Sequence, residues 1–278
     1  MGAGLDIPYR PGPRLVAELA FALALISAGL FAALNHPGGP VVSGIAFLAW
    51  FALCAWRPLA GFSATLALLP VIGFASWTGW LVVEELDLML AAFAAAGYAS
   101  LSTGRGQPAG SRDASAPRRK SRMARRDLWQ TTQLLSPLAM VLLALFLVAC
   151  LIALFRGLSS SDPPPLQWAQ GYFEPLNSVR LFKAFAWVIV LLPVLTRQYR
   201  QRPDDFTHAL TIGMVGGLGL CALAALWERL AFTGLLNFST DYRTTALFWE
   251  MHVGGAALDG YLALGMPFAV WALMQTRH

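Results

Sequence analysis

The stretch from Glu228 to Tyr261, ERLAFTGLLNFSTDYRTTALFWEMHVGGAALDGY, places acidic, basic and aromatic residues between two apolar segments. His252 and Asp259 are seven residues apart, so both would lie on one face of a helix, two turns from each other. Such a pair could move a proton at His252, with Asp259 in a cavity rather than against lipid. A polar helix end without chemistry is the structural alternative.

Basic residues also gather on the face that we predict to be the outer one: Arg180, Lys183, Arg229 and Arg243. That side of a membrane is normally poor in basic residues. Long cationic side chains that reach the headgroups are one explanation, and a site for an anionic lipid-linked substrate is the other. Glu228 with Arg229 could instead form an interfacial ion pair, and Asp241 could order a loop.

Carboxylates cluster in a second stretch, WTGWLVVEELDLML, which holds Glu84, Glu85 and Asp87. Its tryptophans are typical of a membrane interface. The acids could form a solvated turn at the membrane surface. They could also line an outer cavity, because a carboxylate at the bilayer edge is costly unless a partner or water receives it.

The elements that must position these residues are transmembrane helices. The chain is 57% hydrophobic and only 13% charged, which predicts an all-α, polytopic membrane protein of about eight spans. Each span needs roughly 20 apolar residues, and the second and fourth candidates are short. The expected spans are 15–34, 41–56, 59–83, 88–101, 137–155, 181–196, 207–227 and 251–274.

Orientation follows from the Lys and Arg residues, most of which fall on one side of the expected spans. This asymmetry places both termini in the cytoplasm. We therefore expect four helices in residues 1–102, a cytoplasmic loop at 103–135, and four more helices in 136–278. The larger periplasmic loops should lie near 157–180 and 228–250.

The cytoplasmic loop contains RGQPAGSRDASAPRRKSRMARRD, which is rich in Gly, Pro, Ser and basic residues and cannot bury a core. No aromatic residue is interleaved with its charges, so we expect contact with membrane lipids and no nucleic-acid partner. Cys54, Cys150 and Cys221 all lie in apolar runs without ligand or disulfide spacing. We expect packing cysteines, no metal and no cofactor.

Three patches resemble the bacterial O-antigen ligase and O-antigen polymerase superfamily of multi-span membrane proteins. They are WTGWLVVEELDLML, YFEPLNSVRLFKAF and ALWERLAFTGLLNFSTDYRTTALFWEMHVGGAALDGYLALGMPF, the last with Trp-Glu-Arg, Asp-Tyr-Arg and His-x-Gly-Gly elements. The resemblance spans residues of about 59–268 but rests on these patches.

The resemblance implies glycan transfer at the periplasmic face of the bacterial inner membrane, with an undecaprenyl-pyrophosphate-linked saccharide as donor. Fixed cations would stabilise the pyrophosphate leaving group, and a base would activate the acceptor hydroxyl. The implied base candidates are His252, Glu228 and Asp241. The implied substrate-binding residues are Arg180, Lys183, Arg229, Tyr242, Arg243 and Asp259.

Members of that superfamily carry about a dozen spans and a large later loop, so we expect this chain to be an N-terminal portion or a reduced relative. Whether it is itself a glycosyltransferase stays open. A transporter or flippase of lipid-linked sugar is an alternative, although few charges lie within the spans. A non-catalytic subunit that works with polysaccharide-biosynthesis or export partners is another.

The charge asymmetry predicts opposite locations for two loop positions. In a background without native cysteines, Ser115→Cys should react with a membrane-impermeant thiol reagent only after the cells are opened. Ser239→Cys should react in intact cells whose outer membrane is permeabilised. Labelling of both positions from the same side would contradict the predicted orientation.

Overall fold

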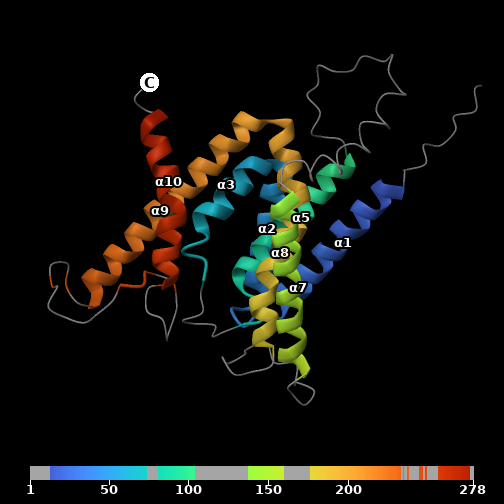
Figure 1. The fold of residues 1–278 in the computed structure, drawn as a ribbon, viewed down its shortest axis with the longest axis horizontal. Helices are drawn as coiled ribbons and strands as arrows, with labels where there is room; N and C mark the ends of the chain where they lie inside the picture. Colours follow the sequence, from blue (N-terminus) through green and yellow to red (C-terminus); the bar gives the residue numbers. More distant parts are fainter. Residues whose placement is uncertain are drawn as a thin grey trace, which may run out of the picture.

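The computed structural model describes residues 13–73, 81–103, 137–159, 176–232, 234, 237, 244–246, 248 and 256–275. This part of the chain is helical, which confirms the predicted all-α class (Figure 1). Its eight helices are α1 (Pro13–Leu34), α2 (Pro40–Trp56), α3 (Pro58–Leu68), α5 (Glu85–Thr103), α7 (Pro137–Ser159), α8 (Asn177–Gln201), α9 (Pro203–Phe232) and α10 (Ala256–Gln275).

Proline sets several of the helix boundaries. Helices α2, α3 and α9 each begin at a proline, which fits the first helical position because its missing N–H would have no partner there. The residue before a proline is pushed out of the helical region. Arg57 and Arg202 obey this rule with φ values of −131° and −148°, so each is a one-residue break between two helices.

Five of the described helices are long and apolar enough to cross a membrane, and the chain is a multi-pass membrane protein. They lie at Leu15–Leu34, Met140–Ser159, Ser178–Gln201, Pro203–Phe232 and Ala257–Gln275. Helices α2 and α3 are apolar but shorter. The count of eight spans and the cytoplasmic placement of the termini stay predictions, and the predicted loop at 103–135 lies outside the described residues apart from Thr103.

The prediction of one continuous span over 59–83 was wrong. Helix α3 ends at Leu68 after 11 residues, and residues 81–84 ahead of α5 are not helical. Eleven residues rise only about 16 Å, roughly half the hydrocarbon thickness. Pro70 lies just past the end of the helix, and it lacks the N–H that would donate to the carbonyl of Leu66 in a continuing helix.

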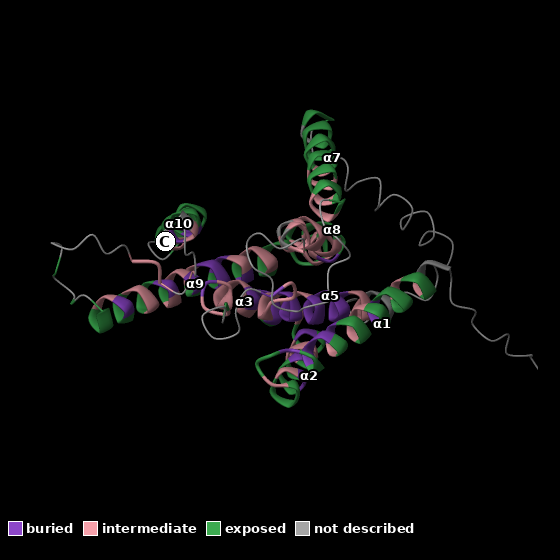
Figure 2. Ribbon diagram, turned by 90° about the horizontal axis from the view of Figure 1, so that it is seen from below, coloured by how far each residue is buried: buried purple, intermediate pink, exposed green. Residues whose placement is uncertain are grey.

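Helix α5 is the centre of the bundle, and it is the most buried helix in Figure 2. It packs against α1, α2, α3 and α8. Its inner turns are almost all alanine, and Ala92, Ala94 and Ala95 have no exposed surface. Small side chains let helix backbones approach closely in a membrane, where packing rather than water exclusion drives helix association.

Helices α3 and α9 meet through two glycines spaced four apart, Gly213 and Gly217. A Cβ atom on Gly213 would lie 2.7 Å from the carbonyl oxygen of Ser63 and 2.8 Å from Cβ of Leu66. A Cβ on Gly217 would lie 3.0 Å from the carbonyl oxygen of Leu66. These contacts leave no room for a side chain, as in other small-xxx-small helix pairs.

Two helices stand at the edge of the bundle. Helix α7 packs chiefly on α8, and α10 packs chiefly on α9 (Figure 2). The surface of α7 is exposed and apolar, with Leu138, Val141 and Phe155 each more than half exposed. Such an outward apolar surface suits lipid.

The contacts between helix ends define two ends of the bundle. The outer end, which is the predicted periplasmic side, holds the last turn of α1 and the first turns of α5 and α8. The contact of Glu85 with His36, in the turn after α1, and the ion pair of Asp87 with Lys183 join these three segments. The inner end holds the last turns of α2 and α8 and the first turn of α9.

Substitution at the glycine contact should separate packing from helix propensity. Gly213→Ala should lower the thermal unfolding midpoint in detergent, because overpacking against backbone costs about 1–3 kcal/mol and alanine returns only about 1 kcal/mol of propensity. Gly219→Ala on the same helix is the control, since a Cβ there would meet nothing within 4 Å. A midpoint that rises equally in both variants would refute the close contact of α3 with α9.

Candidate functional site

The outer end of the bundle holds a buried carboxylate, Asp87, in the first turn of α5. Its Oδ2 atom accepts a hydrogen bond from the backbone N–H of Glu84 at 2.7 Å. This return bond from the third helical residue to the residue before the helix is one half of a capping box. It satisfies a donor that the helix itself leaves without a partner, so Asp87 determines where α5 begins.

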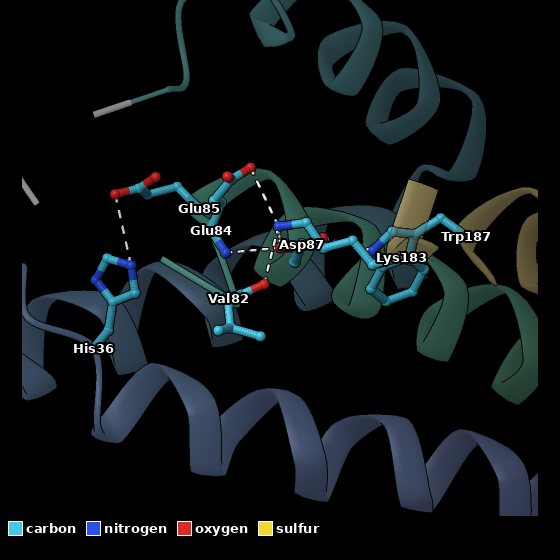
Figure 3. A network of polar contacts seen from close by, with 7 residues as sticks. All are labelled: His36, Val82, Glu84, Glu85, Asp87, Lys183 and Trp187. Atoms are coloured by element: carbon cyan, nitrogen blue, oxygen red, sulfur yellow. Dashed lines mark hydrogen bonds and ion pairs between the residues drawn. The ribbon is translucent and has the colours of Figure 1, made fainter. Parts of the chain in front are cut away.

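The same carboxylate binds two side chains from α8 (Figure 3). Lys183 Nζ donates to Asp87 Oδ2 at 2.6 Å, and the indole Nε1 of Trp187 donates to Oδ1 at 2.7 Å. Lys183 also donates to the carbonyl oxygen of Val82 at 3.0 Å and lies 3.3 Å from Glu84 Oε2. We call Glu84, Asp87, Lys183 and Trp187 the outer polar cluster.

Within the outer polar cluster, the Lys183 ammonium group is occupied by protein acceptors. An ammonium group has three N–H donors, and here three acceptors surround it. Its charge is balanced inside the protein by Asp87 and Glu84. A role in binding pyrophosphate stays a prediction for Lys183, and it would require this cluster to open.

A second polar pair lies beside the cluster and joins His36, in the turn after α1, to Glu85 at the start of α5 (Figure 3). His36 is only 5% exposed. Its Nδ1 atom accepts a hydrogen bond from the backbone N–H of Gly38 at 3.2 Å. A neutral imidazole that accepts at Nδ1 carries its proton on Nε2. That Nε2 atom lies 3.6 Å from Glu85 Oε1, just beyond hydrogen-bond distance.

These two residues line a cavity of about 400 Å³ between the α1–α2 turn, α2, the end of α3 and the start of α5. Trp50 is also in its wall, and its indole Nε1 is buried without a hydrogen-bond partner among the described residues. The remaining wall is mostly apolar: Val42, Ala46, Phe47, Leu68, Ile72, Leu88 and Met89. We call it the outer cavity. An apolar pocket with a few polar groups is the usual form of a small-molecule site.

Sequence reasoning missed His36 and Trp50 as members of a site. It did consider Glu85 as part of a carboxylate wall on an outer cavity, and Glu85 lines the outer cavity. A signal for His36 was present in the sequence. A lone histidine in a Gly- and Pro-rich turn between two apolar helices has few reasons to be there unless a buried partner receives it.

The base candidate Glu228 is 4% exposed and belongs to the last turns of α9. Its carboxylate accepts hydrogen bonds from the backbone N–H of Thr245 at 3.0 Å and of Ala246 at 2.6 Å. The Thr245 hydroxyl donates to it as well, at 3.3 Å. Ala246 has a φ of 53°, a left-handed conformation that is rare for alanine. Glu228 therefore anchors a strained turn onto α9, and a role as a base stays a prediction.

The other predicted site residues fall into separate places. Arg229 donates from Nη2 to the carbonyl oxygen of Asn237 at 2.6 Å. Asp259 lies exposed in the first turn of α10. Arg180, in the first turn of α8, is near the outer polar cluster. The last turn of α9, with Arg229, lies apart from the first turn of α8 in both views (Figures 1 and 2).

Four predicted site residues lie outside the described residues: Asp241, Tyr242, Arg243 and His252. The predicted helical face shared by His252 and Asp259 therefore stays a prediction. Within the described residues, no group of three or more His, Cys, Asp or Glu side chains could hold a metal ion.

The fold and the outer end define a class: an all-helical, multi-pass membrane protein with a buried polar cluster and a mostly apolar cavity at one end of its helices. Comparison with family models, with curated proteins and with solved structures found no match.

The outer polar cluster predicts an unequal effect of its two acids on stability. Asp87→Asn should lower the thermal unfolding midpoint strongly, because it removes a charge-assisted bond of about 1.5–3 kcal/mol and turns an amide N–H₂ group or a poorer acceptor toward Lys183. Glu84→Gln is the matched control. Its side chain is 36% exposed, so its ion pair contributes at most about 1 kcal/mol. Equal midpoints for the two variants would contradict a buried role for Asp87.

Proposed function

We propose that the protein binds a polyprenyl-pyrophosphate-linked glycan at the periplasmic face of the bacterial inner membrane, in the manner of the O-antigen ligase and polymerase superfamily. The observation that carries this proposal is the outer cavity, which pairs an apolar wall with His36 and Glu85. A lipid-linked sugar has the same two-part character. An isoprenoid segment fits the apolar wall, and sugar hydroxyls can bond to an imidazole and a carboxylate.

The chemistry of transfer assigns a task to each kind of group. The acceptor hydroxyl loses its proton to a base, its oxygen bonds to the anomeric carbon, and the bond from that carbon to the pyrophosphate oxygen breaks. The leaving pyrophosphate takes the electron pair, so fixed cations must lie where that charge develops. Arg180 and Lys183, both in the first turns of α8, are the candidates nearest the outer polar cluster, and Lys183 would have to leave Asp87 to act. Arg229 lies apart from them at the end of α9, and Arg243 is a candidate from the sequence alone.

Glu85 extends the list of base candidates in this proposal, and His36 is the residue that would orient it. The Gly38 bond to Nδ1 fixes the ring, and Glu85 lies on the Nε2 side. The Nε2–H group of the imidazole faces the Glu85 carboxylate and can orient it, while Nδ1 already accepts the Gly38 bond and is not free to take a proton from the acceptor. His252, Glu228 and Asp241 remain the candidates that the resemblance implies.

A transporter of lipid-linked sugar is the second candidate, and one observation favours it. A second cavity of about 730 Å³ lies against the same helices, α2 and α5, at the inner end. Cavities at both ends of one helix pair would suit alternating access. Movement of a labelled donor across a proteoliposome membrane, without consumption of the donor, would favour this candidate over transfer.

The proposal is tested with the protein in proteoliposomes, purified undecaprenyl-pyrophosphate glycan and a glycan acceptor. Donor binding and glycan transfer are measured separately. His36→Ala and Glu85→Gln should each weaken binding or slow transfer by roughly 10- to 100-fold, the usual scale for a positioned acid–base group. His208→Ala is the control, because His208 is an exposed histidine near the inner end. Wild-type protein that neither binds the donor nor transfers glycan would refute the proposal, and unchanged variants would remove the outer cavity from it.

A further inference from the structure

The cavity at the inner end has a different character from the outer one. It lies between the last turns of α2, the first turn of α3, the later half of α5 and the last turns of α8, and its volume is about 730 Å³. We call it the inner cavity. One part of its wall is apolar and made of small residues, among them Ala52, Ala55, Ala96 and Gly97. That wall could accept a hydrocarbon chain without displacing large side chains.

The other part of the wall is polar and cationic. The lining residues there are Arg197 and Arg202, Gln198 and Gln201, and Ser100, whose hydroxyl donates to the carbonyl oxygen of Gly97. None of the described lining residues carries a carboxylate. Asp204 and Asp205 are nearby in the chain, but they are exposed in the first turn of α9 and do not line the cavity.

A second observation that points to a ligand is the buried side-chain amide of Gln198, which lacks a hydrogen-bond partner at one atom within the described part of the chain. Its Oε1 atom is buried and has no hydrogen-bond partner among the described residues. A buried amide without a partner costs free energy, and a bound polar group would satisfy it. The oxygen and nitrogen of such an amide are assigned from its partners, so the group can also present its N–H₂ donors to an anion.

The mouth of the inner cavity is built for a membrane interface. Trp56 lines it, and the guanidinium carbon of Arg57 lies 4.5 Å from the centre of the Trp56 ring. Tryptophan is enriched at the level of the lipid headgroups. Arginine stacked on its face stays there with little loss of freedom. Four arginines gather at this end (Arg57, Arg197, Arg200 and Arg202) against the two exposed acids Asp204 and Asp205, so the inner end carries a net positive charge.

We propose that the inner cavity binds the phosphate group of an anionic phospholipid from the cytoplasmic leaflet. Arg197 and Arg202 would hold the phosphate oxygens, since the planar guanidinium fork matches phosphate geometry. The acyl chain lies along the small apolar wall of α2 and α5. The negative potential of that leaflet brings such lipids to a cationic site. This site is at the opposite end from the outer cavity and does not depend on glycan binding or transfer.

The test uses the full chain purified in a non-ionic detergent, with native mass spectrometry to measure bound dioleoyl phosphatidylglycerol and dioleoyl phosphatidylcholine. Wild type should retain phosphatidylglycerol in preference. The double variant Arg197→Gln/Arg202→Gln should lower its affinity about tenfold or more, as expected for the loss of charge-assisted hydrogen bonds. The control is Arg200→Gln, which removes a charge from the same end at a residue that does not line the cavity, and the single variants Arg197→Gln and Arg202→Gln are compared with it.

A second pair of variants distinguishes a lipid from free phosphate. Ala55→Leu fills part of the space beside the apolar wall, so it should weaken phosphatidylglycerol binding. The affinity for inorganic phosphate should stay unchanged. Ala60→Leu, at an exposed position outside the cavity, is its control. Phosphatidylglycerol binding that survives Ala55→Leu but is abolished by inorganic phosphate would assign the site to free phosphate and overturn the lipid proposal.

Equal retention of phosphatidylglycerol by wild type and by the arginine double variant would also overturn the proposal. If the double variant fails to fold, Arg202→Gln alone serves, because Arg202 is exposed and its side chain has no place in the core. That single variant should still bind phosphatidylglycerol more weakly than Arg200→Gln. No difference between these two single variants counts against the site.

Discussion

The carboxylate of Asp87 is the interaction on which the outer end of the molecule depends. One oxygen closes the first turn of α5 and accepts the Lys183 ammonium, and the other accepts the Trp187 indole. A buried carboxylate is unfavourable unless it is paired and hydrogen-bonded, so α5 and α8 must meet in the register that brings Lys183 and Trp187 to it. Glu85 is two residues from Asp87, and the geometry of the His36–Glu85 pair follows from the same capped turn.

Away from that end, small residues take over the task of holding the helices together. The alanines of α5 and the glycines of α9 bring backbones close, and the close approach replaces the water exclusion that a soluble core would use. The two modes are complementary. Polar contacts specify which helices meet at the outer end, while small residues specify how closely they pack through the middle of the bundle.

Local patterns predicted much of the fold. Apolar runs located the described helices, although α9 begins at Pro203, four residues before the expected span. The early end of α3 was missed because the apolar residues continue past Pro70. Hydropathy alone does not register that Pro70 has no backbone N–H to donate. The partners of Lys183 could not be predicted, because Asp87 is 96 residues away and only tertiary packing joins them. Likewise, Glu228 was a candidate base because it is a carboxylate between apolar segments. Only its contacts with Thr245 and Ala246 show that it anchors a turn.

The one-residue breaks at Arg57 and Arg202 have a consequence for how the protein can change over evolution. Consecutive helices that share a corner of a single residue have their rotations coupled. Adding one residue at the start of α9 would turn that helix by about 100°. Ile212 would then take the place of Gly213 against α3, where even a Cβ atom has no room. Sequence length at these corners is therefore as constrained as residue identity in a core, and relatives of this chain should vary in length almost anywhere else before they vary there.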